Sequence, residues 1–403
     1  MRKARSMNRD EKKIMGLTMA SHPLVHLFEG VLPPLIPLLI ADFATDYFHL
    51  GIIVSVFSYA FGIGSLPAGF LADKLGPRRL VTFFLFGSGL LSALVFFIPS
   101  LLAYGIIMGF IGLFCSMYHP ASNTLISQSV REKGKAFGIH GIAGSLGVAS
   151  VPVLSAWFGS NMGWRAPHVI FGFMGIAAAV FSFSVPAKSA FTAVTLDDKN
   201  KPEKGISYLN LIVFYCSAAA LGLTYKGIMT FLPAYMGEKI HFSFLTLNKV
   251  TLGGSVATLA LVSGALGQYI GGRLTDRFRP ESIYSCAIIT GTFFVFIMAK
   301  SSGFILIASA VFYAFFYFST QPMQNFLLSN YLPKHRHGIG YGIHFFVTFG
   351  IGSTAAAVSG YLADNFGLES VFYAMSACFV VSSILSLILL ARAVRQEVHR
   401  ERT

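Results

Sequence analysis

Charged residues are scarce in this sequence of 403 residues. They make up 12% of the chain against 54% hydrophobic residues, and the mean hydropathy is +0.66. A soluble domain carries about 25% charged residues, so this chain has too few to cover a surface that faces water. The alternating ten-residue strands that are typical of an outer-membrane barrel are also missing. The composition therefore excludes a soluble protein and favours helices in a membrane.

Cysteine is rarer still, with four residues and no CxxC spacing: Cys115, Cys216, Cys286 and Cys378. All four lie in apolar segments, so we expect small buried side chains rather than disulfides or metal ligands. No cleavage site follows the basic N-terminus, so the first apolar segment is predicted to be retained. The sequence also lacks a nucleotide-binding loop and a paired nucleophile and base, so we do not expect an enzyme.

Long apolar segments are what the sequence does contain. Each lasts about 20 residues or more, the length that a helix needs to cross a hydrocarbon core about 30 Å thick. We predict twelve helices over residues 16–42, 48–73, 79–98, 100–129, 135–159, 164–186, 207–238, 248–274, 281–299, 302–331, 338–364 and 369–391. The predicted fold class is therefore an all-α polytopic membrane protein.

Basic residues exceed acidic residues and give a net charge of +13. All but five of the 30 Lys and Arg residues fall on the side of the N-terminus. The exceptions are Arg165, Lys239, Lys249 and Lys300 on the other side, and Lys226 inside a helix. By the positive-inside rule both termini are predicted to be cytoplasmic. The basic excess then reflects topology and anionic lipid rather than a nucleic-acid partner.

A charged hairpin between two apolar segments occurs twice. The first, Gly69–Leu80, contains Asp73, a Gly-Pro turn and two arginines. The second, Gly272–Pro280, aligns Asp276 with Asp73 at a shift of 276 − 73 = 203 residues. A repeat of this length indicates that the second half of the chain is related to the first.

Two further pairs of positions keep nearly the same shift. Pro120 aligns with Pro322, and His140 aligns with His344. We infer an internal duplication into two pseudo-symmetric six-helix bundles, residues 1–186 and 207–403. The one long polar stretch, residues 187–206, is predicted to be the cytoplasmic linker between them.

The two hairpins resemble the loops between helices two and three, and between helices eight and nine, of major facilitator superfamily transporters. The resemblance implies that the two halves rock about a substrate site near the bilayer midplane. It also implies a gating role at the cytoplasmic helix ends for Asp73, Arg78, Arg79, Asp276 and Arg277.

Three short motifs carry a narrower resemblance. His26–Glu29, Leu35–Leu39 and Tyr118–Ser122 are similar to the fosmidomycin-resistance branch of this superfamily, which exports small molecules against protons. Glycines at residues 138, 141, 144 and 147, followed by Pro152, match part of a signature of drug/proton antiporters. The resemblance implies a proton antiporter that works by alternating access in a bacterial inner membrane.

Titratable side chains inside the spans are the candidates for proton coupling. A charge at mid-bilayer costs at least about 2.5–3.5 kcal/mol, so it normally faces a cavity or a partner. Glu29 and Lys226 lie at matching depths, about 18–20 Å from the outer ends of corresponding helices. His22 and His26 share one helical face with Glu29, and histidine titrates near neutral pH. The residues that we predict to couple protons are Glu29, His26, His119 and His140.

Other polar side chains in the spans are predicted to bind substrate, because lipid offers them no partner. They are His22, Tyr59, Tyr118, Asn123, Lys226, Gln321, Asn325 and His344. The substrate is expected to be a small molecule, and the protein a monomer in the bilayer without a resident metal or cofactor.

Several alternatives remain open at this point. The histidines also suit transport of a divalent metal ion or a metal chelate. His22 and His26 would fit one histidine box of a membrane di-iron enzyme, although the other histidines are scattered singly. Each histidine by itself would fit a helix-packing role, and Glu29 with Lys226 would fit a fixed ion pair between the halves.

Overall fold

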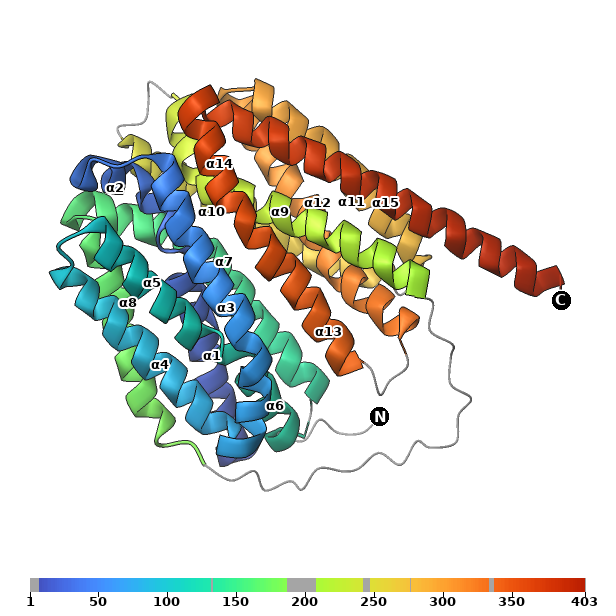
Figure 1. Cartoon of the computed structure of the whole chain (residues 1–403). Coiled ribbons are helices and arrows are strands. Elements are labelled where there is room, and N and C mark those ends of the chain that lie inside the picture. The colour runs from blue at the N-terminus through green and yellow to red at the C-terminus, as the bar shows by residue number, and fades with distance from the viewer. Residues whose placement is uncertain are drawn as a thin grey trace. The chain divides into compact units, whose positions relative to one another are not determined.

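The computed structural model describes residues 7–131, 133–186, 208–241, 247–275, 277–332 and 337–402 (Figure 1), and every element in these ranges is helical. Eleven helices there are long and apolar enough to cross a membrane, and Arg9–Gly30 with Pro33–Phe43, bent by 41°, makes a twelfth if the pair is one span. The predicted fold class, an all-α polytopic membrane protein, is confirmed.

Most helices end within about four residues of the predicted spans, but α1 begins at Arg9, seven residues before the first predicted span, and α15 continues to Arg402, eleven residues beyond the last one. In chain order they are α1 (Arg9–Gly30), η1 (Pro33–Leu35), α2 (Ile36–Phe43), α3 (Tyr47–Leu75), α4 (Pro77–Leu94), η2 (Val95–Phe97), α5 (Leu101–Cys115), α6 (Tyr118–Ser129), α7 (Lys133–Met162), α8 (Arg165–Ser182), α9 (Tyr208–Lys239), α10 (Lys249–Thr275), α11 (Pro280–Lys300), α12 (Gly303–Tyr331), α13 (His337–Phe345), the π-helical η4 (Phe346–Ile351), α14 (Gly352–Phe366) and α15 (Leu368–Arg402).

Prolines explain why two predicted spans are interrupted. Proline lacks a backbone N–H and its ring clashes with the carbonyl four residues earlier. Pro33 and Pro34 open the short turn η1, which separates α1 from α2. Pro120 removes the donor that would bond to the carbonyl of Ser116, and the chain breaks there between α5 and α6.

Close packing of the described chain divides it into two compact units. The first comprises the described residues within Met1–Val31, Val56–Val151 and Met162–Lys199. In it α4 packs against α5, α6 and α8, and α1 packs against α6 and α8. The buried rings of Phe28, Phe84 and Tyr118 connect α1, α4 and α6, with centroids 6.2 and 5.1 Å apart along the series.

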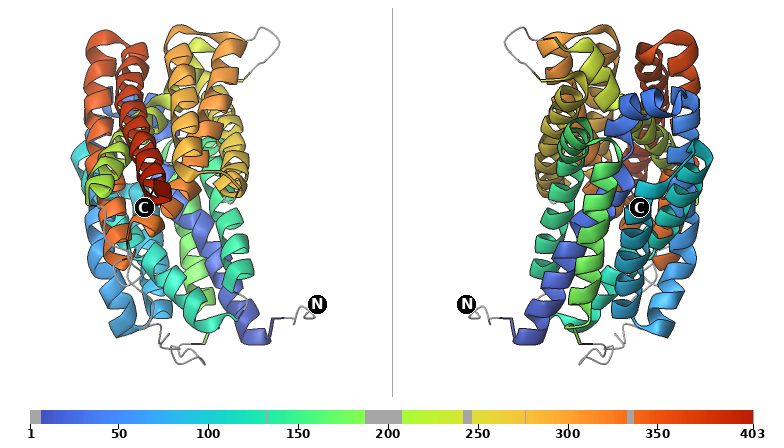
Figure 2. Two further views of the ribbon diagram at one scale, coloured as in Figure 1. Left: turned by 90° about the vertical axis from the view of Figure 1, so that its right-hand side faces the viewer. Right: turned by 90° about the vertical axis from the view of Figure 1, so that its left-hand side faces the viewer.

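The second unit comprises the described residues within Leu32–Ser55, Pro152–Asn161 and Asn200–Thr403. In it α9 packs against α10, α14 and α15, and α12 packs against α10 and α11. Polar side chains inside this unit bond to one another, as they must where water is absent. The hydroxyl of Ser217 lies 3.0 Å from that of Tyr284 and 2.9 Å from that of Ser382. The long α15 runs alongside α11 and on to the C-terminus (Figures 1 and 2).

The two units do not coincide with the two predicted halves. Residues 32–55 and 152–161 pack with the second unit, so α3 and α7 each contribute to both units. The predicted linker, residues 187–206, lies outside the described residues. The boundary between two functional halves therefore stays a prediction.

The prediction of four buried cysteines was wrong in part. Cys115 is buried, but Cys216 and Cys286 are exposed and Cys378 is half-buried. The reason is that an apolar helix in a membrane presents side chains to lipid as well as to its neighbours. Large apolar side chains are exposed in the same way along the described spans, as at Phe97 and Phe304.

Candidate functional site

Four histidines from three helices meet inside the first unit. His22 and His26 lie one turn apart on α1, His119 follows the break between α5 and α6, and His140 lies on α7. The ring of His22 is stacked on that of His140 with centroids 4.1 Å apart. It lies 5.2 Å from the ring of His26 and 5.3 Å from the ring of His119. The structure thus gathers residues that the sequence predicted for coupling and for substrate binding.

Glu29 belongs to the same cluster. Its Oε2 atom lies 3.4 Å from Nδ1 of His26, one turn earlier on α1, and each side chain is 17% exposed. We use the name coupling cluster for Glu29, His22, His26, His119 and His140.

Backbone atoms and glycines fix the central ring of the coupling cluster. Nδ1 of His22 lies 2.8 Å from the backbone carbonyl oxygen of His140, so the neutral ring donates this hydrogen bond and leaves Nε2 as an acceptor. Gly144 provides the space: a Cβ atom there would lie 2.5 Å from Nε2 of His22. Gly147 likewise makes room for the Cα atom of Pro23.

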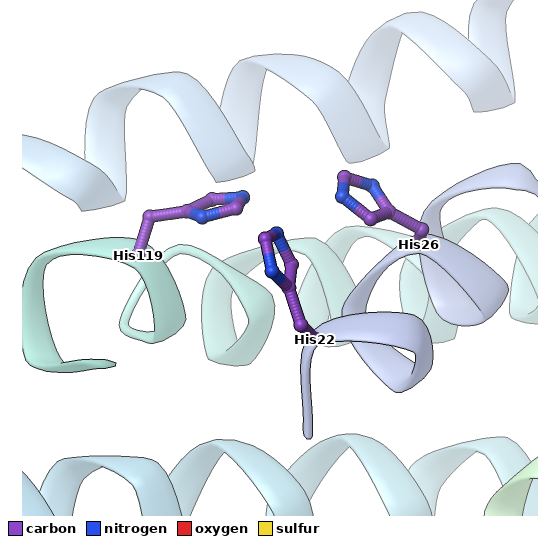
Figure 3. A group of neighbouring side chains, drawn as sticks. All are labelled: His22, His26 and His119. Atoms are coloured by element: carbon purple, nitrogen blue, oxygen red, sulfur yellow. The ribbon is translucent and has the colours of Figure 1, made fainter. Parts of the chain in front are cut away.

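Three of the rings also have the arrangement of a possible metal site (Figure 3). One nitrogen each from His22, His26 and His119 can be chosen so that all three lie within 4.8 Å of one another. The three side chains point toward a common space between α1 and α6. The arrangement therefore suits the exchange of protons among imidazoles and, after a small closure, the binding of a divalent metal ion.

The remaining predicted substrate residues of the first unit lie in different surroundings. Tyr118 is fully buried and its hydroxyl donates to the backbone carbonyl of Thr18 at 2.9 Å, so it joins α6 to α1. Tyr59 is 36% exposed, and Asn123 is exposed as well. The ring of Phe61 lies 6.2 Å from that of His119, a contact that the sequence analysis missed.

The other predicted substrate residues lie in the second unit. Lys226 on α9 is 7% exposed, so a cationic side chain is buried well inside this helix. His344 is also buried, with its ring stacked on Phe214 at 5.5 Å. The side-chain amide of Gln268 donates to Oε1 of Gln321 at 2.5 Å. The last member, Asn325, is exposed on α12. Because Lys226 and Glu29 belong to different units, their pairing stays a prediction.

The predicted gating residues fall into two groups. Arg78 at the start of α4 donates to the carbonyl of Ser182 at 3.2 Å and lies 5.9 Å over the ring of Phe183, so it binds the C-terminal end of α8 within the first unit. A cation is favourable at such a helix end. Arg79 and Arg277 are exposed. The side chain of Asp73 and the whole of Asp276 lie outside the described residues, so gating at the hairpins stays a prediction.

The glycine series on α7 could have pointed to the site more sharply than it did. The sequence showed the whole series as part of one signature and did not show which glycines face another helix. A Cβ atom at Gly138 or Gly141 would meet no atom within 4 Å, whereas Gly144 and Gly147 face α1. Two histidines four residues apart on one helix, together with a glycine on a neighbouring helix that leaves room for a ring, were the pattern that could have indicated the site.

Comparison with known proteins agrees with this architecture. A family model described as the Major Facilitator Superfamily matches residues 19–248 and 214–402. An uncharacterised MFS-type transporter of Methanocaldococcus jannaschii is 25% identical over 380 residues, which cover 90% of this chain and 94% of that protein. The nucleoside transporter NupG has the same fold, with a TM-score of 0.77 at 13% identity, covering 94% of this chain and 99% of that one.

Two further relatives have named substrates. A probable L-galactonate transporter of Escherichia coli is 22% identical over 85% of this chain and 81% of its own length. A cis,cis-muconate transport protein of Acinetobacter baylyi is 20% identical over 86% of both chains. The family match and the apolar helices also confirm a multi-pass protein of the cell membrane. Since the family model covers nearly the whole sequence, the chain belongs to the major facilitator superfamily of transporters.

Proposed function

We propose that the coupling cluster links the movement of a small organic anion to the movement of protons. The observation that carries the proposal is the contact between Glu29 and His26, 3.4 Å apart in a half-buried setting and next to the rings of His22 and His119. A carboxylate and an imidazole at this separation can share a proton. The neighbouring imidazoles offer further acceptors.

Proton binding at this cluster changes its charge, and that change can couple alternating access to protons. An unprotonated Glu29 places a negative charge inside the bundle, where charge is costly, and protonation removes it. A proton that binds one conformation better than the other shifts the equilibrium between them. Glu29 contacts His26 on α1, and the ring of His26 lies 5.2 Å from that of His22 and 5.8 Å from that of His119 on α6.

The anionic nature of the substrate is inferred from two observations. Lys226 offers a buried positive charge on α9. Two relatives that match most of the chain carry the names of transporters for L-galactonate and cis,cis-muconate, which are carboxylates. Export in exchange for protons, as the sequence motifs favour, stays the predicted direction.

A divalent metal ion is the second candidate substrate, since three imidazole nitrogens lie within 4.8 Å of one another. The two candidates differ in what the cluster binds. Calorimetric titration of the purified protein with Zn²⁺ and Co²⁺ separates them. Micromolar binding that is lost in His22→Ala and His119→Ala, with metal flux in liposomes, would favour the metal.

Reconstituted liposomes test the main proposal. Labelled galactonate and muconate are presented with a pH gradient of either sign, and proton movement is recorded by an internal dye. We expect carboxylate flux that reverses with the sign of the gradient, with a KM about tenfold higher in Lys226→Gln because a buried charge partner is lost. Flux that ignores the pH gradient would refute proton coupling.

A further inference from the structure

Two carboxylates cap the first turn of α3. Asp46 is the local cap, because its Oδ1 accepts from the backbone N–H of His49 at 2.8 Å. Asp364 lies in the last turn of α14, and its carboxylate accepts hydrogen bonds from the N–H groups of Tyr47 at 3.0 Å and Phe48 at 2.8 Å. Unpaired N–H groups and the positive end of the helix dipole favour an anion at this position. Asp364 therefore ties α14 to the beginning of α3.

Below this contact the two helices approach closely. A Cβ atom at Gly360 would lie 2.7 Å from the Cα atom of Phe48, so glycine is needed for the approach. One turn further, a Cβ atom at Gly51 would lie 3.0 Å from the carbonyl carbon of Ala356. The hydroxyl of Ser55 donates to the carbonyl of Ser353 at 2.6 Å. We call the contact between residues 47–55 and 353–364 the α3–α14 seam; the predicted topology places it on the outer side.

The internal repeat places a second seam between α7 and α10. A shift of 204 residues aligns Asp364 with Ser160 and Asn365 with Asn161. Both asparagines donate to the carbonyl four residues earlier, at 2.9 Å and 2.8 Å, so the two helix ends have the same local structure. Each helix also ends before a glycine with positive φ, 83° at Gly367 and 88° at Gly163.

The two seams differ in the group that crosses between the helices. Ser160 donates to Oδ1 of Asn248 at 3.2 Å, and Asn248 caps α10 by accepting from the N–H of Thr251 at 2.8 Å. A neutral hydroxyl thus stands where the α3–α14 seam has the carboxylate of Asp364. Charge-assisted hydrogen bonds are about twice as strong as neutral ones, so the α3–α14 seam is the more firmly held of the two.

We propose that Asp364 is the latch of the outer gate. In alternating access the outer helix ends must separate before a site between the halves can open to that side. Separation of α14 from α3 removes the acceptor from the N–H groups of Tyr47 and Phe48, so Asp364 opposes opening. When α7 separates from α10, the first turn of α10 keeps its acceptor, because Asn248 belongs to the same end of α10. Asp364 acts on the gate alone, whatever ion drives transport.

Thiol labelling tests the latch without a known substrate. The four native cysteines are replaced by alanine, and Ser55→Cys is introduced as a reporter, because Ser55 is 5% exposed and lies inside the seam. Cells are treated with a maleimide that does not cross membranes. We expect Asp364→Asn to raise the labelling rate at least fivefold. Asp46→Asn is the matched control, since it removes a carboxylate from the same helix end without touching α14, and its rate should stay within twofold of the parent.

A cross-link provides a second measurement. Phe48 and Tyr361 face each other across the seam with ring centroids 6.3 Å apart, so cysteines at both positions should be joined by a short bifunctional thiol reagent. The yield should fall in Asp364→Asn and recover in Asp364→Glu. Unchanged labelling and unchanged cross-linking in Asp364→Asn would overturn the latch. An equal rise in labelling for Asp46→Asn would also overturn it, because the effect would then come from capping of α3 alone.

Discussion

Replacement of Gly144 by alanine should disturb the coupling cluster through a single atom. The new Cβ would lie 2.5 Å from Nε2 and 2.8 Å from Nδ1 of His22. Ordinary contact between such atoms begins near 3.4 Å, so the imidazole must move by about 1 Å. That movement breaks the 2.8 Å hydrogen bond to the carbonyl of His140 and the stacking of the two rings.

The cost follows from these two changes. Overpacking of a tightly packed interior costs about 1–3 kcal/mol, and the lost hydrogen bond contributes about 0.5–1.5 kcal/mol. A total of about 3 kcal/mol corresponds to a fall in Tm of about 6–12 °C on the scale of domains of 150–250 residues. Because the ring that moves belongs to the coupling cluster, transport driven by the pH gradient should fall about tenfold or more.

Thermal unfolding in detergent and flux in liposomes measure these two effects. Gly141→Ala is the control, since no heavy atom lies within 4 Å of a Cβ at that position. In a His22→Ala background the clash disappears, so Gly144→Ala should then cost little, and the double-mutant cycle isolates the contact. An equal loss of stability with and without the imidazole would refute the reasoning.

Three further substitutions test two packing contacts. Tyr118→Phe removes the 2.9 Å hydrogen bond to the carbonyl of Thr18, so Tm should fall by the equivalent of about 0.5–1.5 kcal/mol while KM for the substrate is unchanged. A raised KM at unchanged Tm would instead indicate that Tyr118 binds the substrate. Arg78→Gln should lower Tm, since Arg78 binds the end of α8, whereas Arg79→Gln should not, because that side chain is exposed. Equal Tm values for the two arginine variants would show that the contact with α8 contributes nothing measurable.

Much of the architecture could be predicted from the sequence because a membrane allows few solutions. Apolar segments of about 20 residues must be helices, since no water satisfies their backbone groups. The breaks near Pro33 and Pro120 depend on which carbonyls lose a donor, and hydropathy alone does not contain that information. The exposure of Cys216 and Cys286 was missed for a related reason, because lipid-facing and buried positions are equally apolar.

The candidate site was predictable to the extent that it follows helix periodicity. The spacing of His22, His26 and Glu29 placed them on one face of α1. The stacking of His140 on His22 and the space at Gly144 depend on how α7 packs against α1, which no local pattern encodes. The sequence did not single out Asp364, because its hydrogen-bond donors lie in the first turn of α3, more than 300 residues earlier in the chain.

The central claim is that Glu29 carries the coupling proton, and an exchange assay on Glu29→Gln tests it most directly. Glutamine keeps the shape of the side chain but stays neutral. Liposomes loaded with unlabelled carboxylate should still exchange it for labelled carboxylate, because exchange needs no net proton movement. The same liposomes should no longer move carboxylate against its gradient when a pH gradient is imposed. Glu29→Gln protein that drives gradient-dependent transport as well as the parent would contradict the account.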